Sequence, residues 1–460
     1  MGQTTKTRNL IESQAGNHPS SCPGQGIFPG DTSFMNTGTS PCPTPVRKPL
    51  PGRLCNLDRL VAAMSARGVD GIVASGANNV YYLTGFIATA HKSDEPRPYA
   101  VVLSRHAPEH PVLVLADYYL ASIVAQPSWV EDIRPFRSVM LPMDVAPARS
   151  DIDRFIPRSA QGLAWIAGAR ERFSFDMASA VRGAIADLGL ASSRIAFDDL
   201  GYGMQLKLES ATPVDGYDVL MDARAIKTAI EVGMLERAAA LNEAAILRTI
   251  AAWAPGCNWR DLGHAYAKAV IDLGGFVHDP GGMVWGHPTG TDAAIQLQTG
   301  LEMDEVRRGT NVMFDCHGIV DLYCWDGGKT WVVDGEPEGD AKLHADATAK
   351  VAETLIDAMR PGTRVSTLQR LARDTYRKCG LKDADQTIAF FHGLGLSHMD
   401  LPTRTADGKP NADWVLEAGM VVPLHLLVPG GERARWWLEE IVHIGPQRSR
   451  PLFSWGFGPN

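Results

Sequence analysis

The feature that most constrains the fold is a repeat in the second half of the chain. Four positions recur at one offset of 106 residues: Pro255, Gly256, Leu262 and Gly274 are followed by Pro361, Gly362, Leu368 and Gly380. Each copy is typical of a helix that ends at Pro-Gly, a second helix, and a glycine that ends it. A chance match is the alternative, because Pro-Gly often follows a helix. The single shared offset favours two related halves around a pseudo-twofold axis, with a site in the cleft between them.

An apolar strand follows each copy and continues the parallel. The strand GTNVMFD places Gly309 six residues before Asp315, and the strand GMVVPLH places Gly419 six residues before His425. Because side chains alternate between the two faces of a strand, equal spacing from the glycine implies the same face. We therefore expect Asp315 and His425 to occupy equivalent positions.

The chain divides into four stretches by composition and pattern. Residues 1–52 are rich in Pro, Gly, Ser, Thr and Asn and predict a flexible tail. Residues 53–220 combine helical periods with apolar strands such as GIVAS, YAVVLSR and PVLVLAD, which predicts an N-terminal α/β domain. A long helical period opens a second domain, α+β in class, at 221–450, and residues 451–460 are expected to form a C-terminal tail.

Charge and composition exclude several classes of function. With 44 Lys+Arg against 52 Asp+Glu, the net charge of -8 makes nucleic acid a poor partner. No stretch has the roughly 18 apolar residues that a membrane span needs, and no secretory core opens the chain. Seven cysteines without a CxxC pair argue against a disulfide framework. We expect a cytoplasmic protein that acts on a small polar substrate.

Two aspartates suggest a cation site. In DCHGIVDLYCWDGG, Asp315 and Asp326 are 11 residues apart, which suits two antiparallel strands joined by a turn near Gly318. Strand pairing can bring both carboxylates to one face, where they repel each other unless a cation lies between them.

Histidines and a buried acid add further candidates. His392 and His398 flank a glycine-rich turn in FFHGLGLSHMDLP, and glycine lets a backbone approach a bound group closely. Glu439 or Glu440 lies in the apolar strand WWLEEIVHI, where a lone carboxylate is costly without a partner.

Taken in this order, the motifs resemble those of the creatinase, prolidase, aminopeptidase P and methionine aminopeptidase family, whose catalytic domain has the pita-bread fold. The likeness covers roughly residues 55–450 and includes NVYYLTGF and RAIKTAIEVGMLERAA. It implies a homodimer in which the partner's N-terminal domain covers the cleft. It also implies one or two divalent metal ions, held by five positions: Asp315, Asp326, His392, position 425 and Glu439.

Position 425 departs from the family, which has Glu where this chain has His425. The extra imidazole lowers the negative charge of the site and favours Zn, Fe, Mn or Ni. Gln298 stands where the family's peptidases carry a His before the first Asp, and His398 follows the metal His by six residues instead of seven. Both changes argue against standard Xaa-Pro peptidase activity. The shorter turn is similar to that of the dimethylsulfoniopropionate lyases built on this fold, in which a carboxylate base occupies the place of His398.

Three functions remain open at this point. The first is a metal-dependent hydrolase that cleaves a C-N bond of a small polar substrate, with His398 or Glu439 carrying the proton. The second is a metal-dependent lyase in which His398 removes a proton to start elimination. The third is a non-catalytic binding protein on the same fold. For either enzyme we expect Tyr82, Lys92 and Arg97, in or near NVYYLTGF, to bind the far end of the substrate.

Overall fold

The computed structural model describes residues 50, 52–87, 98–286 and 302–458. Most of the predicted flexible tail (1–49 and residue 51), Lys92, Arg97 and Gln298 therefore lie outside the described residues. Within these ranges, no helix combines the length and hydropathy that crossing a bilayer requires.

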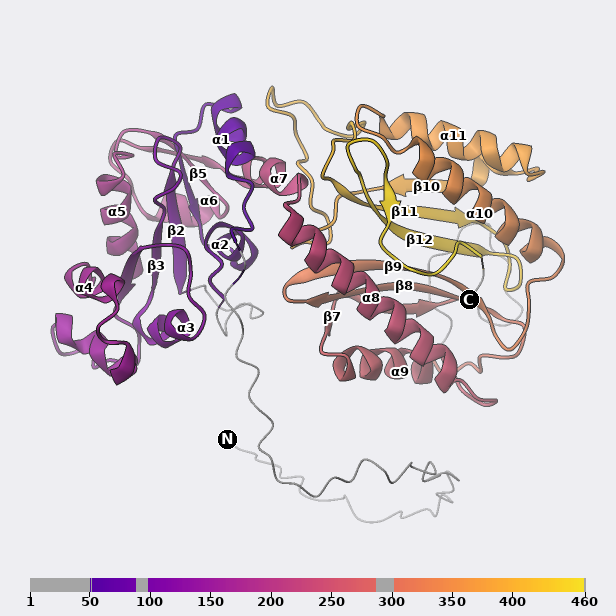
Figure 1. Cartoon of the computed structure of the whole chain (residues 1–460), viewed down its shortest axis with the longest axis horizontal. Coiled ribbons are helices and arrows are strands. Elements are labelled where there is room, and N and C mark those ends of the chain that lie inside the picture. The colour runs from indigo at the N-terminus through magenta and orange to yellow at the C-terminus, as the bar shows by residue number, and fades with distance from the viewer. Residues whose placement is uncertain (1–49, 51, 88–97, 287–301, 459–460) are drawn as a thin grey trace, which may run out of the picture. The chain divides into compact units, whose positions relative to one another are not determined.

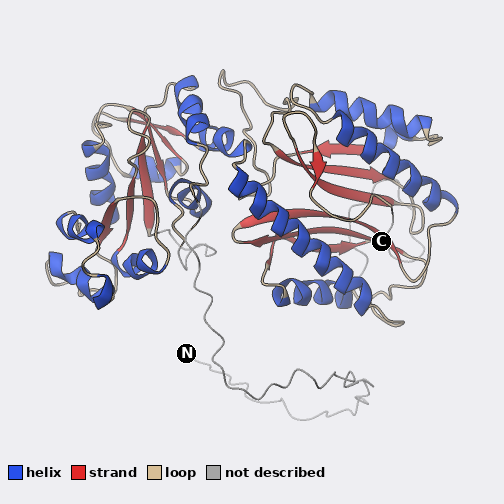
Figure 2. Ribbon diagram, in the orientation of Figure 1, coloured by secondary structure: helices blue, strands red, loops and turns tan. Residues whose placement is uncertain are grey.

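The N-terminal domain is built on a six-stranded sheet with the order β4-β3-β2-β1-β5-β6 (Figures 1 and 2). Its strands are β1 (Gly71–Ala74), β2 (Tyr99–Ser104), β3 (Val112–Ala116), β4 (Asp132–Phe136), β5 (Arg194–Phe197) and β6 (Thr212–Asp215). Its helices are α1 (Leu57–Ala66), α2 (Ala77–Thr84), α3 (Leu120–Ala125), α4 (Ala164–Glu171), α5 (Met177–Asp187), α6 (Leu200–Gln205) and α7 (Tyr217–Ala225). Strands β1 to β3 are buried on both faces, which explains their continuous apolar sequences.

The second domain contains a seven-stranded sheet with the order β10-β11-β12-β9-β8-β7, and β13 adds to β12. Its strands are β7 (Phe276–Trp285), β8 (Asn311–Val320), β9 (Tyr323–Val332), β10 (Ile388–Phe391), β11 (Val421–Val428), β12 (Trp436–His443) and β13 (Arg450–Pro451). Its helices are α8 (Ala229–Ala252), α9 (Trp259–Asp272), α10 (Gly339–Ala358) and α11 (Val365–Lys378). Helices α8 and α9 contact β7 to β9, and α10 and α11 contact β10 to β12 (Figure 1).

The structure confirms the two duplicated halves. Helix α9 spans Trp259–Asp272 and α11 spans Val365–Lys378, so both ends keep the offset of 106 residues. Gly256 and Gly362, which precede these helices, have φ of 91° and 93°. The halves meet where β9 pairs with β12, and this junction lies at the centre of the sheet.

The β8–β9 hairpin differs from the expectation in the place of its turn. Asp321 and Leu322 form the turn, with φ of 49° and 69°, whereas the sequence suggested a turn near Gly318. Gly318 instead pairs with Trp325 across the hairpin, and a Cβ on it would lie 2.0 Å from the Trp325 ring. The glycine therefore makes room for a buried tryptophan.

The residues after β12 do not form a free tail within the described chain. The backbone N-H of Phe453 donates to Glu440 at 3.1 Å, and that of Ser454 donates to Glu243 at 2.8 Å. The Phe453 side chain is buried in the core that includes the first half of the domain. This segment covers the face of β12 to which Glu440 belongs, opposite the face that carries Glu439.

Candidate metal centre

The central strands of the second domain bring a group of polar side chains together, here called the central cluster. Strand β8 supplies two of its members, β9, β11 and β12 supply one each, and two follow β10. They are Asp315, His317, Asp326, His425, Glu439, His392 and His398. All come from the strands at or next to the junction of the two halves or from the loop after β10. The cluster therefore lies where the duplicated halves meet.

Asp326 lies at the middle of the cluster and is fully buried. Its Oδ2 lies 3.1 Å from His392 Nε2 and 2.8 Å from His398 Nε2, while its Oδ1 lies 2.5 Å from His317 Nε2. A single carboxylate on β9 thus contacts three imidazoles from both halves of the domain.

His425 points into the cluster from β11. It pairs with Glu439 across the two strands, and its Nε2 lies 2.6 Å from Glu439 Oε1 and 4.0 Å from Asp326 Oδ2. The exposed ring of Phe390 stacks on the His425 ring at a centroid distance of 3.8 Å. The imidazole that replaces the family's Glu therefore lies within the cluster.

His317 is the cluster member that the sequence reasoning missed. Its Nε2 lies 3.4 Å from Asp315 Oδ1 as well as 2.5 Å from Asp326, which is its direct partner across the hairpin. The signal was available in DCHG, because residues two apart on a strand share a face. Placing Asp315 in the site therefore also places the side chain of His317 on the same face of the strand.

Burial and mutual repulsion set the protonation of the carboxyl groups. Burial raises the pKa of Asp315 to about 6. Burial, and then the negative charges of Asp326 and Asp315, raise the pKa of Glu439 well above its usual value. Burial also disfavours a charged Asp326, but its close contacts with the imidazoles of His317, His392 and His398 outweigh burial and hold the pKa of Asp326 well below its usual range. Three carboxyl groups thus share one buried site that holds a single strongly ionised member.

Two histidines are oriented as metal ligands are. His392 Nδ1 lies 3.0 Å from the Gly393 carbonyl oxygen, and His317 Nδ1 lies 3.3 Å from that of Gly281. A metal bound at Nε2 would displace the proton that this atom otherwise shares with Asp326 and would leave the Nδ1 proton to donate to the carbonyl, which is the usual arrangement behind a metal-bound histidine. Both Nε2 atoms face Asp326.

The donor set fits a divalent transition metal. Two groups each have ligand atoms within 4.8 Å of one another, namely Asp326, His392, His425 and Glu439, and His317, Asp326 and His398. Among the described residues, His392 Nε2 and both Glu439 carboxylate oxygens are buried without a hydrogen bond of good geometry. A cation would satisfy these atoms, and mixed imidazole and carboxylate donors suit Zn, Fe, Mn or Ni.

Only part of the predicted substrate-binding set can be placed. Tyr82 has no exposed surface, and its hydroxyl accepts a hydrogen bond from the backbone N-H of Asn56 at 3.1 Å. It belongs to the core of the N-terminal domain, so the expectation that it touches a substrate is wrong. Its place in an apolar helix, α2, explains the difference, because that helix packs most of its residues inward.

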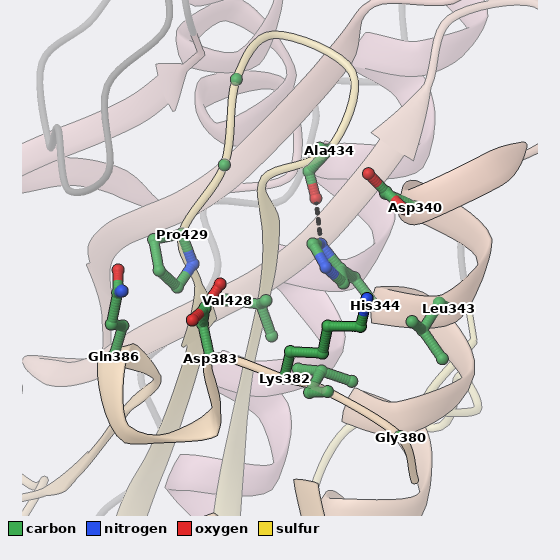
Figure 3. Close-up of a pocket in the computed structure, with 13 residues that line it drawn as sticks. Asp340, Leu343, His344, Gly380, Lys382, Asp383, Gln386, Val428, Pro429 and Ala434 are labelled. Atoms are coloured by element: carbon green, nitrogen blue, oxygen red, sulfur yellow. Dashed lines mark hydrogen bonds between the residues drawn. The ribbon is translucent and has the colours of Figure 1, made fainter. Parts of the chain in front are cut away.

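A cavity of about 650 Å³ lies away from the cluster, and Figure 3 shows its lining. Asp340 and His344 on α10, Lys382 and Asp383 after α11, and the end of β11 border it. His344 Nδ1 lies 2.5 Å from the Ala434 carbonyl oxygen. No member of the central cluster lines this cavity, so the cavity is not part of the candidate metal centre.

Comparisons with known proteins support the division into two domains. The family model of the Creatinase/Prolidase N-terminal domain matches residues 56–226, and that of Metallopeptidase family M24 matches residues 233–444. Proteins named probable dipeptidase PepE, from Mycobacterium bovis and Mycobacterium tuberculosis, are 27% identical over 244 residues. This alignment covers 50% of the present chain and 59% of theirs, so the chain spans little more than half the length of these relatives.

Solved structures show the same fold over most of the chain. A dipeptidase from Pyrococcus horikoshii OT3 has a TM-score of 0.62 at 19% identity and covers 86% of this chain and 97% of its own. An Xaa-Pro dipeptidase from Bacillus anthracis has a TM-score of 0.62 at 18% identity, with coverages of 87% and 97%. The chain belongs to metallopeptidase family M24, with a creatinase/prolidase N-terminal domain followed by a pita-bread catalytic domain.

Proposed function

We propose that the protein is a metal-dependent hydrolase that cleaves a C-N bond of a small polar substrate. The observation that carries the proposal is the buried convergence of Asp326, His392, His425 and Glu439. A bound cation would satisfy buried carboxylates and imidazoles at such distances, and a divalent metal would supply hydrolysis with a more acidic water and a polarised carbonyl. One or two ions, of Zn, Fe, Mn or Ni, are compatible with the two ligand groups.

His398 is the residue we assign to proton transfer. Its side chain is 31% exposed, against 7% or less for His317, His392 and His425, so a substrate has access to it. Its Nε2 contact with Asp326 orients the ring, and a positioned imidazole is the side chain that enzymes use most often as a general acid or base. Glu439 is the second candidate, because a carboxyl group with a raised pKa can hold a proton near neutrality.

The substrate class is argued from the relatives and from this chain's departures. Dipeptidases are among the relatives, which supports cleavage of an amide of small size. His425 and the six-residue spacing from His392 to His398 separate this chain from the Xaa-Pro peptidases. We therefore propose a small polar amide other than a standard Xaa-Pro dipeptide. The cytoplasmic location and the homodimer stay predictions.

The lyase is the second candidate, and the exposure of His398 favours it as well. A partly exposed imidazole beside a buried metal centre can remove a proton from a substrate whose carboxylate is bound there. The two reactions differ in their products, because hydrolysis consumes water and elimination yields an alkene.

The test combines metal analysis with the variant His398→Ala. We expect the isolated protein to hold at least one tightly bound transition metal ion, and His398→Ala to keep it while losing about 10²-fold in kcat. Activity would be assayed with a dipeptide, an N-substituted amide and a sulfonium betaine. Loss of the metal in His398→Ala would make the residue a ligand. A protein without metal and without activity on all three substrates would favour the binding protein.

A further inference from the structure

We propose that a buried ion cluster, formed by Arg224, Lys227 and Asp400, positions His398 by holding the loop 393–400 in place. The proposal rests on the role assigned to His398 in the proposed function. It also assigns a role to two sequence motifs, NVYYLTGF at 79–86 and RAIK at 224–227, which contribute no residue to the central cluster. We call these three residues the anchor cluster.

Arg224 connects the N-terminal domain to the loop. One guanidinium nitrogen donates to Asn79 Oδ1 at 2.8 Å, and the other donates to Ser397 Oγ at 2.7 Å and lies 2.6 Å from Asp400 Oδ1. Ser397 directly precedes His398, and Asp400 follows it by two residues. The planar fork of an arginine can hold several acceptors at fixed angles, so Arg224 holds the side chains of one residue on each side of His398.

Asp400 and Lys227 complete the anchor cluster, and Asp400 lies close to Gly395 in the glycine-rich turn. Lys227 Nζ lies 3.2 Å from Asp400 Oδ2 and donates to the Arg224 carbonyl oxygen at 2.7 Å. The side chains of Arg224, Lys227 and Asp400 are at most 1% exposed, so little solvent screens their charges. A Cβ on Gly395 would lie 2.1 Å from Asp400 Oδ2, so the glycine allows this close approach.

Neighbouring elements fix the rest of the loop through its backbone. Asn78, on α2, donates to the Leu396 carbonyl oxygen at 2.7 Å. The backbone N-H of Cys324, on β9, donates to the Gly395 carbonyl oxygen at 2.8 Å. The N-terminal domain and the strand that carries Asp326 thus hold the loop from two directions.

This arrangement matters because His398 lies in an irregular segment and not on a strand. The other cluster histidines lie on β8 or β11 or directly after β10, where sheet pairing sets their positions. A group in an irregular loop must be held by tertiary contacts, since a displacement of about 1 Å can cost on the order of 10²-fold in rate. None of the three residues belongs to the central cluster, so in this proposal they act through His398 and are positioning residues.

The test measures the loop itself in the full-length protein without substrate. Amide hydrogen exchange of peptides that span 393–400 reports how often the loop opens. The rate at which diethyl pyrocarbonate modifies His398, followed by mass spectrometry, reports how firmly the ring is held. We expect Asp400→Asn to raise both rates by about 10-fold or more. Arg224→Lys should give an intermediate increase, because lysine keeps the charge and loses the fork.

A milder variant and a matched control keep the test decisive. Asn78→Ala removes one hydrogen bond from outside the buried ions, and we expect about a 3-fold increase in loop exchange with the fold intact. Asp187→Asn breaks an ion pair of the same length, 2.6 Å from the buried Arg134 in the N-terminal domain, although the Asp187 side chain itself is 63% exposed. This control should leave both rates unchanged. Unchanged rates in Asp400→Asn and Asn78→Ala would overturn the proposal and leave the anchor cluster a contributor to stability alone.

The two readouts also separate this inference from the proposed function. They need neither turnover nor a known substrate, so increased rates support the positioning role even if the hydrolase activity is absent. Where activity is found, Asp400→Asn should lower kcat with little change in KM. A loss of kcat without a change in loop exchange would contradict positioning through the loop.

Discussion

The two halves of the catalytic domain have similar backbone arrangements but contribute different side chains to the central cluster. Helices α9 and α11 keep the same length and offset, and a glycine with φ near 90° precedes each. The first half supplies Asp315, His317 and Asp326 to the central cluster, whereas the second supplies His392, His398, His425 and Glu439. The comparison shows that the sheet preserves side-chain positions while the residues at those positions are free to diverge.

Even the equivalent helices are capped in different ways. The side chain of Asn258 caps α9 locally and forms a capping box with Asp261. Helix α11 follows Arg364, which makes no side-chain cap, and Asp413 instead accepts from the backbone N-H of Ser366 at 2.9 Å. A carboxylate distant in sequence thus accepts from a backbone N-H in the first turn of α11, whereas a local amide side chain accepts from such an N-H in α9.

The largest expected effect comes from Asp326, which contacts histidines of both halves. Asp326→Asn keeps the shape and removes the charge on which three imidazoles converge. We expect metal affinity to fall at least about 10²-fold and kcat about 10³-fold, measured by metal competition and turnover. Asp321→Asn, in the exposed turn of the same hairpin, is the control and should change neither. Full metal retention in Asp326→Asn would remove Asp326 from the ligands.

A smaller effect is expected where the halves differ most directly, at His425. His425→Glu restores the family's residue and adds one negative charge beside Glu439 and Asp326. The ratio of Zn to Mn affinity should fall about 10-fold, because carboxylate donors suit the harder ion. Competition between the two metals measures this ratio, with His425→Gln as the variant that adds no charge. An unchanged ratio in His425→Glu would mean that residue 425 does not contact the ion.

The sequence predicted most of the fold because its periodic and repeated features are local. The apolar strands, the Pro-Gly stops and the shared offset determine the order of elements and the pseudo-twofold axis. Asp315 and His425 could be paired in advance because each follows its glycine by the same six residues. Their convergence then follows from sheet register, which a one-residue shift would destroy.

What the sequence could not provide depends on contacts between distant segments. The turn at Asp321–Leu322 was misplaced because Gly318 looks like a turn residue and in fact accommodates the Trp325 ring. Tyr82 was expected to bind the substrate, and its burial, which excludes that, depends on how α2 packs. The anchor cluster brings Arg224 and Lys227 to Asp400, and Arg224 also contacts Asn79; no local pattern reveals that these distant residues meet.

The smallest expected effect tests the shared backbone itself, through Gly256→Ala and Gly362→Ala. Both glycines have φ near 90°, and no atom lies within 4 Å of a Cβ added at either, so backbone strain alone sets the cost. Each change should lower the free energy of unfolding by about 1 kcal/mol, and the double variant by about 2 kcal/mol, measured in urea. Gly233→Ala, inside α8 and equally uncrowded, is the control and should stabilise the protein by up to about 1 kcal/mol. Equal costs at 256 and 362 would extend the equivalence of the halves to their energetics, and a cost at only one of them would limit it to geometry.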